Sequence, residues 1–221
     1  MSLAELSERM RSDWNRRISQ DYRFWMSDGY ASDNLMWESG QRDYHLLMQN
    51  FQFQPGQVLL EIGCGVGRLL KPALKDFSRV IGVDISSEAI SKASELLGPV
   101  FNLELKVSSG IGLEGINKNS IDAVVSFAAI GSIPTTVVSR YLLEAQRVLK
   151  DNGVVRFQMY LGNTQDVSTD DTLYLRCYKT DCAIEAFAKA GFELEWIREL
   201  NLPFQASSPE LGIQAVLVSL R

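Results

Sequence analysis

The chain has 221 residues, of which 46% are hydrophobic and 22% are charged, and its net charge is -5. This length and balance fit one folded domain with a sizeable core plus an extension. The acidic charge argues against a nucleic-acid substrate held mainly through its phosphates. No apolar run approaches the roughly 18 residues of a membrane span. We therefore expect no nucleic-acid partner and no membrane partner.

The cysteines and the first residues bear on the cellular compartment. Three cysteines are too few and too scattered for a disulfide framework or a zinc site. The first nine residues are polar and lack the apolar core of a signal peptide. We therefore expect a cytoplasmic protein with reduced thiols and no bound metal.

The first 54 residues are predicted to form a helical extension or cap. Apolar positions recur at helical spacing over residues 1 to about 28, and a second helix is expected from about Gly40 to Asn50. The polar stretch between them, Ser27 to Ser39, predicts a mobile loop. The segment is also rich in aromatic residues, namely Trp14, Tyr22, Phe24, Trp25, Tyr30 and Trp37. Packing on the domain is one interpretation of these rings, and closure over a ligand is the other.

From Pro55 onward, predicted strands alternate with predicted helices. Strands are expected at residues 58–62, 79–84, 101–107, 120–127 and 154–161. Helices are expected from Gly67 to about residue 76, and at residues 88–97, 137–149 and 180–190, with a turn at 150–153. Two final strands, 192–198 and 213–220, have no helix between them and can pair antiparallel. The order predicts an α/β domain over residues 55–221, with a doubly wound and mostly parallel sheet.

A glycine turn follows the first of these strands. Gly63, Gly65 and Gly67 alternate after the apolar segment Val58–Ile62. Glycine lets the backbone approach a ligand closely, and the next helix points its first amide groups at that ligand. Dinucleotide sites favour G-x-G-x-x-G, whereas this turn has G-x-G-x-G with Arg68 in place of the third glycine. A structural turn without a ligand is the alternative interpretation.

The second predicted strand ends in an acid. Asp84 lies 17 residues after Gly67, near the position expected for a carboxylate that binds ribose hydroxyls. The alternative is a helix-capping role, because Ser86 and the residues after it form a plausible helix start.

These features together resemble the class I S-adenosylmethionine-dependent methyltransferases. The E-x-G-x-G-x-G pattern from Glu61 to Gly67 resembles motif I of that family, and Asp122 with its strand resembles motif II. Residues 141–154 resemble the helix and turn before the fifth strand. The resemblance covers residues 55 to 220. It implies a seven-stranded Rossmann-like sheet with an antiparallel last strand, and S-adenosyl-L-methionine as the cofactor.

The resemblance also implies which residues bind the cofactor. Glu61 is expected to face the methionyl ammonium, and Asp84 the ribose. Family members often bind the adenine amine with an aspartate, and Ser109 stands at that position here. The full set is Glu61, Gly63, Cys64, Gly65, Gly67, Asp84, Ile85, Ser109, Gly110, Ser126 and Phe127.

The sequence gives fewer indications of which residues contact the methyl acceptor. Loops that follow the strands are expected to border the acceptor, including Ala128–Pro134 and Leu161–Tyr178. Some family members have a histidine where this chain has Ser132, so the general base and the acceptor atom are left open. The candidates for acceptor contact are Tyr30, Trp37, Ser132, Tyr160 and Tyr178.

The sequence thus predicts a transferase that moves a methyl group in line to a small-molecule acceptor, as a monomer or homodimer. One alternative is a binding protein of the same fold that has lost or altered its catalysis, because the acid at Ser109 and the histidine at Ser132 are missing. A nicotinamide-dependent oxidoreductase is disfavoured by the glycine spacing and by the closing pair of strands.

Overall fold

The fold is organised by one sheet. The computed structural model describes residues 2–26, 32–163, 172, 176–200 and 213–221. The sheet order is β3-β2-β1-β4-β5-β8-β7, and a short β6 pairs with β5 outside this path. The strands are β1 (Val58–Ile62), β2 (Arg79–Asp84), β3 (Leu103–Val107), β4 (Ile121–Ser126), β5 (Leu149–Gly162), β6 (Cys177–Lys179), β7 (Leu194–Glu199) and β8 (Gln214–Leu220).

The strand directions confirm the predicted fold class. Strands β1 to β5 pair in parallel, while β8 is antiparallel to both β5 and β7. The α/β sheet is therefore mostly parallel, with a reversed last strand. Six α-helices and one 3-10 helix accompany the sheet in the described residues: α1 (Leu3–Trp25), α2 (Asp33–Leu47), α3 (Leu70–Ala73), α4 (Ser87–Leu97), η1 (Ile130–Ser132), α5 (Thr135–Val148) and α6 (Thr180–Lys189).

Two apolar clusters form the core, one on each face of the sheet. Leu59 belongs to the cluster that includes side chains of α2 and α3, while Leu60 belongs to the cluster of α5 and α6. This alternation follows from the two-residue period of a strand. Because β1 is covered on both faces, four of its five residues are buried. This explains why its sequence is nearly continuous in apolar residues.

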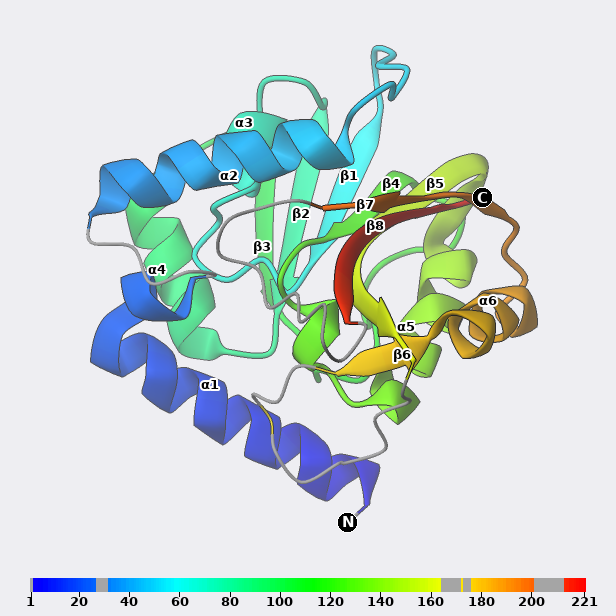
Figure 1. Cartoon of the computed structure of the whole chain (residues 1–221). Helices are drawn as coiled ribbons and strands as arrows, with labels where there is room; N and C mark the ends of the chain where they lie inside the picture. The colour runs from blue at the N-terminus through cyan, green and yellow to red at the C-terminus, as the bar shows by residue number, and fades with distance from the viewer. Residues whose placement is uncertain (1, 27–31, 164–171, 173–175, 201–212) are drawn as a thin grey trace.

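Helix α1 runs along the edge of the sheet at which the parallel strands end (Figure 1). The hydroxyl of Ser7 donates to the carbonyl oxygen of Ser109, which follows β3. The side-chain oxygen of Asn15 accepts a hydrogen bond of 2.8 Å from the hydroxyl of Ser86, which follows β2. Helix α1 is thereby tied to the loops in which ligands bind in open α/β sheets.

Two local expectations were wrong, and one short strand was not predicted. The predicted loop from Ser27 to Ser39 is helical from Asp33 onward, because the hydroxyl of Ser32 caps the helix by accepting from the Leu35 amide at 3.3 Å. Residues 27–31 lie outside the described part of the chain. The predicted turn at 150–153 belongs to β5, which begins at Leu149 and absorbs the extra residues as a bulge opposite β4. Strand β6 was not expected, since its three residues are too few to show a pattern.

Among the described residues, no helix combines the length and the apolar character needed to cross a membrane. That same part of the chain contains no group of three or more His, Cys, Asp or Glu side chains that could hold a metal ion. The division into a cap at residues 1–54 and a domain at residues 55–221 stays a prediction.

Candidate functional site

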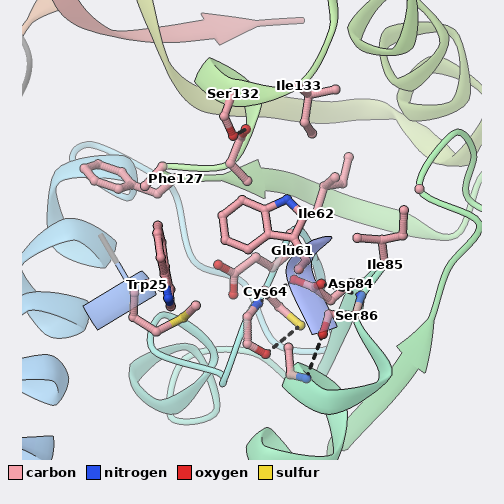
Figure 2. A pocket seen from close by; sticks show the side chains of 18 of the residues that line it. Trp25, Glu61, Ile62, Cys64, Asp84, Ile85, Ser86, Phe127, Ser132 and Ile133 are labelled. Carbon is pink, nitrogen blue, oxygen red and sulfur yellow. Dashed lines mark hydrogen bonds between the residues drawn. The ribbon is translucent and has the colours of Figure 1, made fainter. Parts of the chain in front are cut away.

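A pocket lies where β1, β2 and β4 end, and α1 closes its open side. Figure 2 shows the side chains of Glu61, Asp84 and Trp25 in this pocket. The residues that line it are Met10, Trp14, Ile18, Trp25, Met26, Glu61, Ile62, Gly63, Cys64, Gly65, Arg68, Leu69, Asp84, Ile85, Ser86, Ala89, Gly110, Phe127, Ala128, Ala129, Ser132, Ile133 and Tyr141.

The glycines of the turn serve two purposes. All three have left-handed backbones, with φ of 70° at Gly63, 52° at Gly65 and 86° at Gly67. A Cβ on Gly67 would stand 2.6 Å from the side chain of Leu97, so this glycine lets α4 pack closely. A Cβ on Gly65 would stand 2.6 Å from the sulfur of Met26, inside the pocket. Gly65 is therefore the glycine whose missing side chain leaves backbone open to the pocket.

Asp84 joins the glycine turn to the start of α4. Its Oδ2 accepts from the Gly65 amide and its Oδ1 from the Ser86 amide, each at 2.8 Å. Burial raises the pKa of the Asp84 carboxyl, and the backbone amides that donate to it act in the opposite direction. Each oxygen keeps a further lone pair, because a carboxylate has about four acceptor sites. The carboxylate can therefore accept two more hydrogen bonds from a ligand.

Glu61 is a buried acid with an unmatched oxygen. The residue is 1% exposed, and its Oε2 has no hydrogen-bond partner among the described residues. Burial raises the pKa of the Glu61 carboxyl well above its usual value, Arg68 opposes that shift and Asp84 adds to it. Leaving a buried acceptor unpaired costs free energy. The site therefore fits a ligand group that brings a positive charge or N–H donors to this oxygen.

Helix α2 supports the turn through a buried ion pair. Nη1 of Arg68 donates to the carboxylate of Asp43 and, at 3.2 Å, to the hydroxyl of Ser39. A Cβ on Gly40 would lie 2.2 Å from the Arg68 carbonyl oxygen, so only glycine allows this approach. The sequence interpretation missed this contact. The available signal was a glycine inside a helical pattern, which often marks close packing.

The wall after β4 contains a strained backbone. Ala128 has a φ of 60°, and its amide donates to Oε1 of Gln158 at 3.1 Å. A left-handed backbone conformation at a residue other than glycine costs free energy, and such conformations are concentrated at functional sites. Ser132 and Ile133 continue this wall, opposite Asp84 in Figure 2. Here the backbone is held in place by a buried side chain of β5.

The cap side of the pocket is aromatic and apolar. Trp14 and Trp25 line it, and the guanidinium of Arg17 lies 4.9 Å from the first ring and 5.5 Å from the second. Arg17 is 9% exposed and donates to the hydroxyl of Thr172 at 3.3 Å. These contacts fix two large rings over the pocket. Met10, Ile18 and Met26, which the sequence interpretation did not single out, complete this side.

The structure brings most of the predicted cofactor residues together. Eight of them line the pocket, and Gly67, Ser109 and Ser126 do not. The Ser109 hydroxyl donates to Oε1 of Glu114 at 2.8 Å, and the Ser126 hydroxyl donates to the Ile62 carbonyl at 2.8 Å. The binding roles of these side chains stay predictions. Arg68 and Tyr141 line the pocket without having been predicted.

The acceptor candidates are dispersed. Ser132 lines the pocket. Trp37 lies on α2, with the ammonium of Lys71 4.0 Å from its ring, and Tyr160 packs where a Cβ of Gly131 would be. Tyr178 belongs to an apolar core cluster, and Tyr30 lies outside the described residues. Trp37, Tyr160 and Tyr178 are not among the pocket residues, so their role in acceptor contact stays a prediction.

Known proteins that are similar to this chain include several methyltransferases. A family model described as a methyltransferase domain matches residues 60–157. A sterol 24-C-methyltransferase from Gibberella zeae is 28% identical over 187 residues, which are 76% of this chain and 48% of that protein. A 2-methyl-6-phytyl-1,4-hydroquinone methyltransferase from Synechocystis is 30% identical over 102 residues, which are 46% of this chain and 31% of that protein.

Solved structures share the fold. The crystal structure of geranyl diphosphate C-methyltransferase from Streptomyces coelicolor superposes with a TM-score of 0.75 at 16% identity, and 97% of each chain is covered. The chain spans less than half the length of the two curated relatives.

Proposed function

Because the chain belongs to the class I S-adenosylmethionine-dependent methyltransferase family, we propose that it transfers a methyl group from this cofactor to an apolar small molecule. The observation that carries the proposal is the arrangement of Glu61, Gly65 and Asp84 around one pocket. The cofactor has an ammonium group, a carboxylate group and a ribose diol. Glu61 supplies an acid for the ammonium, Gly65 an open backbone turn for the carboxylate, and Asp84 a second acid for the diol.

The residues present fit the cofactor. The unmatched oxygen of Glu61 would accept a hydrogen bond from the methionyl ammonium, and the carboxylate of Asp84 would accept hydrogen bonds from both ribose hydroxyls. Gly65 would leave its backbone open to the methionyl end. When bound, the cofactor supplies a methyl group on a sulfonium sulfur, and the thioether that remains after transfer is an excellent leaving group. The chain's own contribution is then to orient the acceptor in line with that methyl group and to exclude water.

The lining favours an acceptor that attacks without first losing a proton. Burial raises the pKa of the Cys64 thiol well above its usual value, and it raises the pKa of the Tyr141 hydroxyl as well. Both groups therefore stay protonated at neutral pH. Among the described pocket residues, Glu61 and Asp84 are the acids, and both are assigned to the cofactor. A neutral amine meets this condition, and so does an alkene carbon, whose π electrons form the new C–C bond as the C–S bond breaks. The carbocation formed from the alkene then releases a C–H proton to a weak base such as water, whereas an alcohol would need a base before it attacks.

The cap side favours an apolar acceptor body. Trp14, Trp25 and Met10 present ring and thioether surface to the pocket. Three of the similar proteins are named for a sterol, a phytyl-hydroquinone and geranyl diphosphate, which all carry branched hydrocarbon, whereas another is named for phosphoethanolamine, a polar amine. We infer a branched hydrocarbon acceptor, methylated at carbon.

The test is transfer of a labelled methyl group from S-adenosylmethionine to a panel of acceptors. The panel contains a prenyl diphosphate, a prenylated quinol, a sterol with a side-chain alkene, a polar amine and a thiol. We expect label in a branched hydrocarbon acceptor, and loss of transfer in Asp84→Ala. Label in the amine or thiol alone contradicts the proposed acceptor. Cofactor binding without transfer to any hydrocarbon acceptor favours the alternative of a binding protein.

A further inference from the structure

The end of α1 lies directly over the glycine turn. Met26, the residue that ends α1, places its sulfur 2.6 Å and its terminal methyl 3.2 Å from the Cβ position of Gly65. Trp25 and Met26 both line the pocket beside Glu61. Under the proposed function, the methionyl end of the cofactor would need this same approach to the Gly65 backbone. The Met26 side chain and the cofactor therefore compete for one space.

The segment that carries Met26 is separate from the rest of α1. Asp21 interrupts the helix with a φ of -163° and a ψ of 95°. Its Oδ1 accepts from the amides of Arg23 at 3.1 Å and Phe24 at 3.3 Å, as an N-cap does at a helix start. Residues 22–26 thus form a turn with its own cap, which we call the gate turn. A break of this kind lets the gate turn move while the rest of α1 stays in place.

The body of α1 and the gate turn are anchored differently. The body is held by Ser7 and Asn15 on the loops after β3 and β2. The gate turn is bonded to Asp33, the first residue of α2, and its rings also contact cations: Trp25 lies 5.5 Å from the Arg17 guanidinium, and Tyr22 lies 5.3 Å from the Lys92 ammonium. Oδ1 of Asp33 accepts from the Tyr22 hydroxyl at 2.8 Å and from Nε of Arg23 at 2.6 Å.

The Asp33 anchor is accessible to solvent. The side chains of Arg23 and Asp33 are 39% and 37% exposed. Exposed ion pairs contribute little to stability, so this contact can open and close readily. The buried Asp43–Arg68 pair beneath the glycine turn, with side chains at most 5% exposed, offers no such freedom.

We propose that the gate turn controls entry to the cofactor site, with Asp33 holding it closed and Met26 covering Gly65. This inference rests on the proposed function, because the ligand admitted is the cofactor. The binding-competent fraction of the protein is the fraction in which Met26 has left Gly65. Weakening the Asp33 contact raises that fraction, and apparent affinity rises in proportion.

The experiment is stopped-flow measurement of tryptophan fluorescence on mixing the full chain with S-adenosylhomocysteine. Trp14 and Trp25 line the pocket and report binding. Asp33→Asn and Tyr22→Phe should raise the association rate by about 2- to 5-fold, the range for loss of an exposed pair. The dissociation rate should stay unchanged. Met26→Ala should raise the association rate at least as much.

The matched control is Glu185→Gln. Glu185 forms an exposed ion pair of 2.8 Å with Lys189 on α6, and neither residue lines the pocket or contacts the gate turn. We expect wild-type association for this variant. Unchanged or slower association in Asp33→Asn, Tyr22→Phe and Met26→Ala would overturn the gate. A wild-type chain that shows no binding of S-adenosylhomocysteine would instead overturn the proposed function.

Discussion

The two sides of the pocket are built by different kinds of contact. On the turn side, backbone amides within 19 positions of Asp84, those of Gly65 and Ser86, donate hydrogen bonds to its carboxylate. On the cap side, α1 is held by side chains that meet residues far away in the sequence, such as Ser7 with Ser109 and Arg17 with Thr172. The turn side is therefore specified locally, and the cap side depends on the whole fold.

This difference suggests how the two sides divide the work. The turn side offers fixed polar groups that suit one cofactor. The cap side offers aromatic and thioether surface, with the breakable contact at Asp33, that suits a variable acceptor. The predictions below test whether changes on the turn side affect cofactor binding more than changes on the cap side.

The largest effect is expected from Gly65→Val. A branched side chain at a φ of 52° would fill the space that the cofactor needs. The affinity for S-adenosylhomocysteine should fall by about 100-fold or more, since overpacking at a tightly packed position costs up to about 3 kcal/mol and a tenfold loss of affinity corresponds to about 1.4 kcal/mol. Calorimetric titration of the variant with S-adenosylhomocysteine measures this affinity.

Gly56→Val is the matched control for that substitution. Gly56 has a φ of 84°, but a Cβ there meets nothing within 4 Å, and it precedes β1 at the opposite edge of the sheet. This variant should lose stability and keep its affinity. Equal affinity in both variants would show that the glycine turn does not line the cofactor site.

Asp84→Ala should have the next largest effect. Loss of charge-assisted hydrogen bonds to the ribose should cost about 1.5–3 kcal/mol of cofactor binding. Asp122→Asn is the control, because Asp122 also accepts a backbone amide, that of Val58 at 2.8 Å, at the far end of β1. A folded Asp84→Ala protein with unchanged affinity would remove Asp84 from the site.

Glu61→Gln should change stability and binding in opposite directions. Burial raises the folded-state pKa of Glu61 above the ordinary 4.5. The folded protein therefore binds more protons than the unfolded one, and the free energy of unfolding falls as pH rises from 4.5 through the raised value. Glutamine removes this penalty, so at neutral pH the ligand-free variant should be more stable by about 1–3 kcal/mol.

The same Glu61→Gln variant should bind S-adenosylhomocysteine more weakly, because it lacks the carboxylate for the ammonium. In the wild type, affinity should also fall as pH drops through the raised pKa of Glu61. Thermal melting and titration across pH measure both effects. A variant that is less stable and binds equally well would show that Glu61 is a purely structural acid.

The sequence predicted the turn side well for a physical reason. The glycine spacing, the alternation of strands and helices, and Asp84 at a strand end are local patterns with direct geometric meaning. These patterns identified Glu61, Gly63, Cys64, Gly65 and Asp84, which the structure brings together. The antiparallel last strand followed from the absence of a helix between the final two strands.

The cap side could be predicted only in part. The aromatic density of the first residues suggested closure over a ligand, but it did not separate Trp14 and Trp25, which line the pocket, from Trp37, which contacts Lys71. The start of α2 at Asp33 depends on a capping serine inside a polar stretch that also fits a loop. Such choices are decided by tertiary contacts, which a single sequence does not display.

The smallest effect on the cofactor is expected from the cap side. Trp14→Ala should weaken S-adenosylhomocysteine binding by about 2- to 10-fold, the range of a lost ring contact of about 0.5–1.5 kcal/mol. Trp37→Ala is the control and should leave affinity unchanged. An effect of Trp14→Ala as large as that of Gly65→Val would erase the difference between the two sides.

The central claim is that the pocket around Glu61, Gly65 and Asp84 binds S-adenosylmethionine. Calorimetric titration of the wild-type chain with S-adenosylmethionine, S-adenosylhomocysteine and NAD tests it most directly. We predict one site per chain with micromolar affinity for the sulfonium cofactor and its product, and none for NAD. Binding of NAD with no binding of either S-adenosyl compound would contradict the account.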